Sequence, residues 1–294
     1  MKGGAPAAGS RRRPLAPPEL ADDAHKGDAG RVLSLCGSRA MPGAALLVAR
    51  AAQRAGAGLV TAGCLDGSLM QILPCAAPEA VLLDLERLDS LPATLAARGD
   101  HAVVVGPGIG RDERARELVR IVLGVGLVCP LVLDADALNV LKGEPERVRA
   151  HRGPLVITPH PGEAQRLLGR GVPSDADGRL RAARELWERT GAVVCLKGRH
   201  TVVLQGDERF VNESGNSGMA TAGAGDVLTG ILGAYTALCA AGEHPGWTAF
   251  EAAASAVHVH GLAGDLAAEH VGRRGMIASD LIEALPRAQM RREP

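Results

Sequence analysis

The sequence predicts a single α/β domain built on a mostly parallel β-sheet with helices on both faces. Short runs rich in β-branched residues alternate with longer Ala-, Leu- and Arg-rich stretches through most of the 294 residues, and strands separated by helices are typical of parallel sheets. No long Pro-, Gly- or Ser-rich linker and no repeat divides the chain, so we expect one domain over residues 27–290. Residues 1–26, which hold Arg11-Arg12-Arg13 amid Ala, Pro and Gly, are expected to form a disordered tail.

Eight strands and seven helices account for the periodic part of the chain. The strands are expected at residues 32–36, 59–62, 80–83, 102–105, 131–134, 155–158, 192–197 and 201–204. The helices are expected at residues 44–55, 114–123, 161–168, 176–190, 226–241, 247–269 and 279–285. Only Gly198-Arg199-His200 separates the last two strands, so we expect an antiparallel hairpin at one edge of the sheet.

The composition argues against several classes of partner. The formal net charge is +0, which gives no electrostatic reason to expect binding to nucleic acid or to an anionic membrane. We expect no membrane span and no secretory signal, because no long uncharged apolar run is present. The six cysteines form no C-x-x-C pair, which favours a reducing, cytoplasmic compartment. Aromatic residues make up only 2%, so backbone and aliphatic groups would have to hold any nucleotide base.

Polar turns follow four of the expected strands. They are GPGIG at 106–110, DADALN at 134–139, TPHPGE at 158–163 and KG at 197–198. In open α/β sheets, ligands bind outside the carboxyl ends of the strands, where these turns would meet. The sequence therefore predicts one cleft at this edge of the sheet.

A run of small and turn-forming residues at 214–226 leads directly into an apolar helix pattern. Such a turn leaves backbone N–H groups free, and phosphate oxygens can bind there at the positive end of the helix dipole. Asp226 stands at the mouth of this predicted anion site, where a lone carboxylate would repel phosphate. We expect it to accept a proton from a hydroxyl that attacks phosphorus. The alternative is a Gly-rich connector in which Asp226 only caps the helix.

Other polar residues have more than one interpretation. Lys197 lies at the end of a buried strand, where a charge without a partner is costly. This favours an anionic ligand, and it predicts that the ligand-free fold gains stability when the charge is removed. Asp134 and Asp136 could bind a metal, or one of them could cap the next helix. Cys195 is expected in the buried core rather than as a nucleophile.

Six segments, in order along the chain, resemble the NAD(P)H-hydrate dehydratases, a family with the ribokinase-like three-layer α/β/α fold. They are Gly37-Ser38 with Pro42-Gly43-Ala44, the four polar turns (the last as Leu196-Lys197-Gly198), and GNSGMATAGAGDVLTG at 215–230. The resemblance extends over roughly residues 30–286, which leaves out little but the expected tail.

The resemblance implies a lyase of nicotinamide nucleotide repair. Members of this family dehydrate the S epimer of NADH or NADPH hydrated at C6 of the nicotinamide ring. Phosphorylation of the C6 hydroxyl makes it a good leaving group, and elimination restores the dihydronicotinamide. Most bacterial and archaeal members use ADP and release AMP and phosphate, whereas eukaryotic members use ATP. The resemblance also implies Mg²⁺ bridging the nucleotide phosphates and assembly as a homotetramer.

The resemblance assigns residues to each part of this reaction. Asp226 would be the catalytic base. The residues expected to contact the hydrated dinucleotide are Ala44, Gly108, His160 and Asp226. The residues expected to line the nucleotide site are Lys197, Gly198, Arg199, His200, Thr201 and Gly225. The anion hole would be formed by Gly223, Ala224 and Gly225, and the polar supports of the cleft would be Asn139 and Glu163. His160, between two prolines, could instead simply cap the following helix.

The chain departs from the family pattern at three positions. Ala222 stands where many relatives have glycine, which requires a negative φ or a local adjustment. Ala224 replaces a residue that is often Ser, Thr or Met, and Met41 replaces a tyrosine. Many relatives also carry an N-terminal epimerase domain; this chain has no room for one, so we expect that activity to come from elsewhere.

Two alternatives to a dehydratase remain. A small-molecule kinase of the same fold, such as a vitamin-precursor kinase, shares the Gly-x-Gly-Asp turn but would not account for segments 158–163 and 216–220. A non-catalytic nucleotide-binding module would not need both Asp226 and Lys197.

Overall fold

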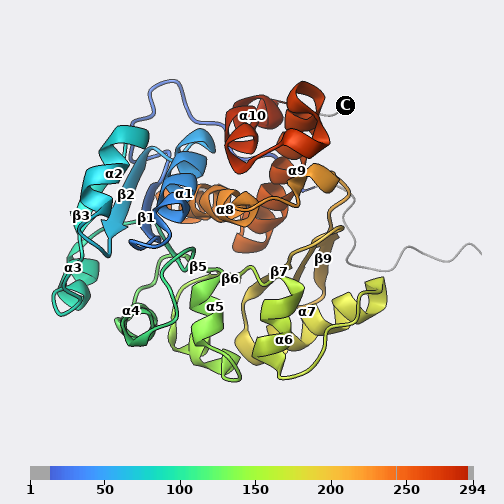
Figure 1. Ribbon diagram of the computed structural model, residues 1–294, viewed down its shortest axis with the longest axis horizontal. Helices are drawn as coiled ribbons and strands as arrows, with labels where there is room; N and C mark the ends of the chain where they lie inside the picture. Colours follow the sequence, from blue (N-terminus) through green and yellow to red (C-terminus); the bar gives the residue numbers. More distant parts are fainter. Residues whose placement is uncertain (1–13, 243, 291–294) are drawn as a thin grey trace, which may run out of the picture.

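Within the described residues, a nine-stranded sheet lies between two layers of helices (Figure 1). The computed structural model of the chain describes residues 14–242 and 244–290. The strands are β1 (Arg31–Leu35), β2 (Leu59–Cys64), β3 (Val81–Asp84), β4 (Ala102–Val105), β5 (Leu131–Leu133), β6 (Leu155–Ile157), β7 (Val193–Leu196), β8 (Val202–Gln205) and β9 (Glu208–Val211). Their order is β3-β2-β1-β4-β5-β6-β7-β8-β9. Strands β1 to β7 are parallel, and β8 and β9 are antiparallel to their neighbours.

Two cores flank the sheet because successive side chains of a strand point to opposite faces. The α-helices are α1 (Pro42–Arg54), α2 (Leu69–Ala76), α3 (Leu91–Ala97), α4 (Glu113–Gly124), α5 (Asp136–Val140), α6 (Pro161–Leu168), α7 (Ala176–Thr190), α8 (Ala224–Ala241), α9 (Ala249–Gly275) and α10 (Ala278–Met290). Val32 and Val104 belong to a core that contains residues of α1, α2, α8, α9 and α10. Leu33 and Val103 belong to a second core, on the other face, that contains residues of α3 to α7. The predicted three-layer, mostly parallel fold is confirmed.

Helix α8 is the central helix of its layer. It packs on α1, and its glycines allow a very close approach: a Cβ on Gly230 would lie 2.5 Å from the carbonyl oxygen of Val48, and one on Gly233 would lie 2.7 Å from Val104 Cγ2. Among the described helices, only α8 is long and apolar enough to cross a membrane, and 72% of it is buried inside the domain. This burial accounts for its apolar composition.

The structure differs from the expected elements in a few places. Strands β7 and β8 form the predicted antiparallel hairpin, but β9 pairs outside it, so the hairpin does not lie at the edge of the sheet. Helices α2, α3 and α5 were not expected. Residues 14–26 contain turns but no helix or strand, and the backbone N–H of Leu15 donates to Glu251 (3.3 Å). Residues 1–13 lie outside the described part of the chain, so the disordered tail stays a prediction.

The strand order reverses direction between β1 and β4. From β1 the chain continues to β2 and β3 on one side, whereas β4 begins the series that runs to β9 on the other. At such a switch point the connections that leave the two strands run to opposite faces of the sheet, and ligands of open α/β proteins bind there. Gly37, after β1, donates its N–H to Pro107 O (2.7 Å) after β4, so the two turns lie side by side at this point.

Candidate active site

The four predicted polar turns meet at the carboxyl edge of the sheet. After β4, a Cβ on Gly106 would lie 1.8 Å from the carbonyl oxygen of Asp134 after β5, so only glycine allows this approach. Gly110 N–H donates to Asp136 Oδ2 (3.1 Å). After β7, Lys197 N–H donates to Pro159 O (2.8 Å) after β6. The turns therefore form one continuous rim, as the sequence predicts.

Ala44 and Gly108, two of the residues expected at the dinucleotide, lie against each other beside the β1/β4 switch point. Gly108 has φ +70°, and a Cβ there would lie 2.7 Å from Ala44 Cβ and 3.1 Å from Met41 O. Met41 is 41% exposed beside them. The close approach of the two residues fixes the turn after β4 against the start of α1 at the expected substrate side.

His160 caps helix α6, as the simpler interpretation proposed. Its Nδ1 accepts a hydrogen bond from Gly162 N–H (2.9 Å), and its own N–H donates to Glu163 Oε2 (2.8 Å). These reciprocal bonds form a capping box. Burial lowers the pKa of His160, which favours a neutral ring. Capping fixes the direction of the ring and does not exclude contact between its half-exposed face and a ligand.

The two residues expected to support the cleft are both anchored. Glu163 is 4% exposed, and burial raises the pKa of its carboxyl. Asn139 accepts a hydrogen bond from Arg166 Nη1 (3.0 Å) and donates to Asp136 Oδ1 (3.4 Å). Asn139 thereby joins α5 to α6 and holds the second and third turns together.

All six residues expected at the nucleotide site line one cavity of about 750 Å³. The cavity is enclosed by the turn after β7, the segment that follows β9, and helices α8 and α9. Its apolar lining includes Leu228, Val257 and Met219, and none of the lining residues is Phe, Tyr or Trp. This agrees with a base held by backbone and aliphatic groups. Sequence reasoning did not find His260 or Arg273, which also line the cavity, because nothing in the helical pattern of α9 marks them.

The turn after β7 has an unusual backbone that a distant arginine holds in place. Gly198 has φ +143° and His200 has φ +57°, and Thr201 donates its hydroxyl to Gly198 O (3.0 Å). Arg179, on α7, donates to Leu196 O (2.9 Å) and Lys197 O (3.2 Å). The Arg179 contact could not be anticipated from the sequence, because the helix and the turn meet only in the folded chain.

Helix α8 begins without a side-chain cap. Its N-cap is Gly223, with φ +85° and no capping hydrogen bond, whereas α4, α6, α7 and α9 are each capped by a side chain. Of the residues expected in the anion hole, Ala224 already donates its N–H to Thr221 O (3.4 Å), whereas the N–H groups of Gly225 and of Asp226 have no acceptor among the described residues. Ala222 does not adopt a positive φ, as its methyl group requires. The start of α8 therefore presents free donors where the anion hole is expected.

A histidine of α9 forms a hydrogen bond with the first turn of α8. His260 Nε2 lies 2.9 Å from Ala224 O, and because a carbonyl can only accept, the ring donates from Nε2. Burial lowers the pKa of His260 to about 4, so the ring is neutral at physiological pH.

Lys197 has a protein partner, so the expectation of an unpaired buried charge was wrong. Its Nζ lies 2.5 Å from Asp134 Oδ1 and 4.0 Å from Glu163 Oε2. Although burial lowers the pKa of Lys197, these two carboxylates raise it above its usual range. The same ammonium faces α8, because a Cβ on Gly225 would lie 3.5 Å from Nζ. Removing the lysine would leave the buried carboxylate of Asp134 without its cation. We therefore no longer expect the ligand-free protein to become more stable when the lysine is removed.

Asp226, in the first turn of α8, makes no hydrogen bond within the described residues, and Gly223 rather than Asp226 is the N-cap. Burial, followed by the negative charge of Asp134, raises the pKa of Asp226 to about 7, against the opposing effect of Lys197. A carboxyl with a pKa near neutrality and a free pair of oxygens is suited to accept a proton.

The neighbouring carboxylates do not form a metal cage. Both oxygens of Asp134 are engaged, by Lys197 and by the hydroxyl of Thr229. Asp136 accepts from Gly110 N–H and from Arg111 Nε. The described part of the chain contains no group of three or more His, Cys, Asp or Glu side chains that could hold a metal ion. Cys195 is fully buried, and burial raises its thiol pKa to about 12, as expected for a core residue.

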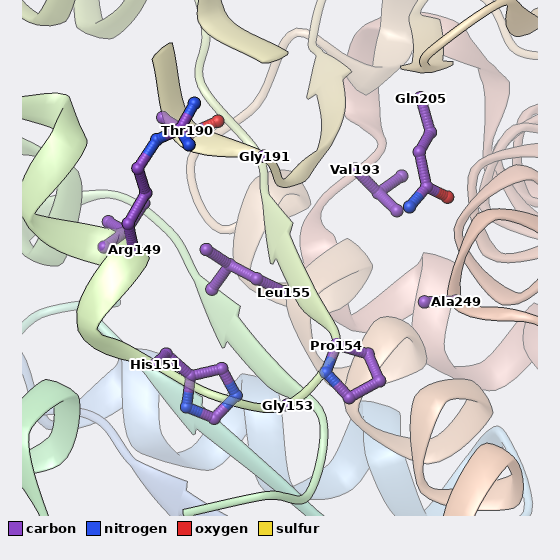
Figure 2. A pocket seen from close by; sticks show the side chains of 11 residues that line it. Arg149, His151, Gly153, Pro154, Leu155, Thr190, Gly191, Val193, Gln205 and Ala249 are labelled. Carbon is purple, nitrogen blue, oxygen red and sulfur yellow. The ribbon is translucent and has the colours of Figure 1, made fainter. Parts of the chain in front are cut away.

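A second cavity, of about 380 Å³, lies at the amino ends of the parallel strands, opposite the carboxyl ends that carry the candidate active site (Figure 2). It is lined by Leu155 and Val193, the first residues of β6 and β7, and by Gln205, the last residue of the antiparallel β8. These positions mark the amino ends of the parallel strands. None of the expected site residues lines this cavity, so it is separate from the candidate active site.

The chain resembles proteins of one family over most of its length. The family model described as NAD(P)H-hydrate dehydratase matches residues 32–287. An ADP-dependent (S)-NAD(P)H-hydrate dehydratase of Neisseria meningitidis is 40% identical, over 90% of this chain and 86% of that protein. A bifunctional NAD(P)H-hydrate repair enzyme of Moorella thermoacetica is 43% identical over 89% of this chain, which spans only 49% of that protein. The chain thus spans about half the length of such bifunctional relatives.

A solved structure agrees with these sequence relatives. The ADP/ATP-dependent NAD(P)H-hydrate dehydratase of Bacillus subtilis, co-crystallized with ATP and Mg²⁺, is 30% identical and covers 95% of each chain with a TM-score of 0.79. With the family model spanning the sheet, the switch point and the start of α8, the chain belongs to the NAD(P)H-hydrate dehydratase family.

Proposed function

We propose that this protein is an ADP-dependent hydro-lyase that restores NADH and NADPH from their S-epimeric hydrates. The observation that carries the proposal is Asp226, a carboxyl with a pKa raised to about 7 at an uncapped helix start beside the 750 Å³ cavity. The name of the Neisseria relative supports the S epimer and ADP.

The proposed reaction begins with transfer of a phosphoryl group from ADP. Asp226 accepts the proton of the C6 hydroxyl as the oxygen attacks the terminal phosphorus of ADP, and AMP leaves. The free N–H groups at the start of α8 and the ammonium of Lys197 stabilise the negative charge of the transferred group. Ala44, Gly108 and His160 hold the dinucleotide on the side of the switch point.

Elimination completes the proposed reaction. The C6–O bond breaks with release of phosphate, assisted by the lone pair of the ring nitrogen, and a proton leaves the adjacent ring carbon. The sum is hydrated NAD(P)H plus ADP giving NAD(P)H, AMP and phosphate. Proton acceptance by a positioned carboxylate accounts for about 10²–10⁴-fold of the rate of such a step.

Magnesium is proposed to enter with the nucleotide. Mg²⁺ commonly binds substrate phosphates and water rather than an all-protein cage, and the occupied carboxylates of Asp134 and Asp136 provide no such cage. When bound, the ion would offset the charge of the phosphates.

The decisive experiment compares wild type with Asp226→Asn. Purified protein is incubated with hydrated NADH and ADP, and restored NADH is followed by its absorbance while AMP is measured by chromatography. Wild type should form the two products in equal amounts. The variant should lose about 10²–10⁴-fold in rate while ADP binding, measured by calorimetry, is retained. A near-normal rate in the variant would exclude Asp226 as the base.

The kinase alternative is tested in the same experiment. A kinase would leave a phosphorylated alcohol and would not restore NADH absorbance, and a non-catalytic module would show no turnover at all.

We also propose a cytoplasmic homotetramer. The six cysteines are free, which fits a reducing compartment, and light scattering of the purified protein tests the tetramer.

A further inference from the structure

Thr229 is a buried polar residue to which the proposed reaction assigns nothing. It lies on α8 one turn after Gly225 and is 0% exposed. Its hydroxyl is 2.6 Å from Asp134 Oδ2 and 3.1 Å from Gly225 O. Because the hydroxyl has one proton and the carboxylate is charged, the shorter, charge-assisted bond to Asp134 is the stronger of the two.

Asp134 has its two oxygens committed to two different elements. Oδ2 accepts from Thr229 on α8, and Oδ1 accepts from Lys197 after β7. The side chain is 1% exposed, so water does not compete for either oxygen. A carboxylate with both oxygens bonded in this way has one orientation, and it transmits that orientation to the lysine.

Lys197 would otherwise have considerable freedom. Its four-carbon stem carries several rotatable bonds, and its second carboxylate neighbour, Glu163, is at the limit of an ion pair (4.0 Å). Held by Asp134, the ammonium faces the bare backbone of Gly225 in the first turn of α8. Thr229 is three residues after Asp226 on the same helix, so the chain of contacts ties the lysine to the helix that carries the proposed base.

We propose that Thr229 and Asp134 are positioning residues. They hold the Lys197 ammonium at the first turn of α8, at a fixed place relative to Asp226, before any nucleotide binds. The inference rests on the proposed function in that the lysine is taken to meet the phosphates of ADP. It adds that the spacing between cation and base is set by the protein and not by the ligand.

The test replaces the hydroxyl of Thr229 without changing its shape. Thr229→Val should lower kcat by roughly 10–100-fold, because a displacement on the order of 1 Å can cost about 10²-fold, and it should weaken ADP binding. Thr229→Ser, which keeps the hydroxyl, should restore both. Thr236→Val is the matched control: Thr236 is also 0% exposed on α8, but within the described residues its hydroxyl bonds only to Leu232 O and Gly233 O of its own helix.

Two measurements separate positioning from a general loss of stability. The ADP dissociation constant and kcat are measured well below the melting temperature of every variant. Positioning requires a loss in Thr229→Val, recovery in Thr229→Ser and near-normal values in Thr236→Val. Equal losses in both valine variants, no recovery with serine, or unchanged values in Thr229→Val would each overturn the proposal. Should Thr229→Val not fold, Thr229→Ala and Thr236→Ala make the same comparison.

Failure of the proposed function gives a different result. If wild type does not dehydrate the hydrate, that function is wrong, yet ADP binding by the same variants still decides whether the contacts position Lys197. If wild type turns over and Thr229→Val matches it in both kcat and ADP binding, only the positioning proposal is wrong.

Discussion

Removing the charge of Asp226 should stabilise the protein while it slows turnover. Burial and the charge of Asp134 raise the pKa of this carboxyl from 3.8 to about 7 in the folded chain. A carboxyl whose pKa is higher in the folded than in the unfolded state destabilises the fold as it ionises. This loss of stability begins above pH 3.8 and is complete above about pH 7. The rise in the pKa corresponds to roughly 4 kcal/mol of folding free energy.

Asp226→Asn is neutral at every pH and avoids this loss. Its free energy of unfolding, measured by urea denaturation, should exceed that of wild type by up to about 4 kcal/mol near pH 8. The advantage should grow by roughly 3 kcal/mol between about pH 5 and pH 8. Asp207→Asn serves as control, because the Asp207 side chain is fully exposed and its replacement should give no such gain. An advantage of Asp226→Asn that does not grow with pH would refute the reasoning.

Three further predictions concern the ion pair, the pH dependence and the phosphoryl donor. Lys197→Ala should weaken ADP binding in calorimetric titration and lower the free energy of unfolding by about 3–5 kcal/mol, because it leaves Asp134 buried without its cation; a variant as stable as wild type would contradict this, and unchanged ADP affinity would remove Lys197 from the nucleotide site. The kcat/KM for the hydrate should rise with pH through an inflection near 7 as Asp226 loses its proton, and a flat profile across that range would exclude Asp226 as the base. AMP should accumulate with NADH when ADP is supplied, and ATP should be slower at equal concentration; an ATP rate as high as the ADP rate would remove the ADP preference and leave the dehydratase reaction standing.

The regular parts of the fold could be predicted because their patterns are local. Helices α6 and α7 begin and end where the sequence places them, since each follows a capping residue and ends at a glycine in the left-handed conformation. The missed elements carry weaker signals. Helix α2 has eight residues with Pro74 inside it, and α5 has five residues within a polar turn. Strand β9 has four residues, of which Glu208 and Arg209 are charged.

The backbone of the candidate site could be predicted better than its side-chain contacts. The polar turns follow from the strands that precede them, and glycine marks most of the positions where φ is positive, such as Gly108 and Gly223, although His200 also has a positive φ. The bond between Lys197 and Asp134 joins residues 63 positions apart. It depends on the register of β5, β6 and β7, which a local pattern does not specify. The wrong expectation about Lys197 has this origin.

The close packing of α8 has a consequence for how this protein can vary. The helix that begins with the proposed base is seated on α1 through Gly230 and on the sheet through Gly233, with no space for a methyl group. A substitution at either glycine would have to lift the whole helix, and the lift would reach Asp226 because the helix is a stiff rod between them. The position of the proposed base therefore depends on buried glycines one or two turns further along the helix.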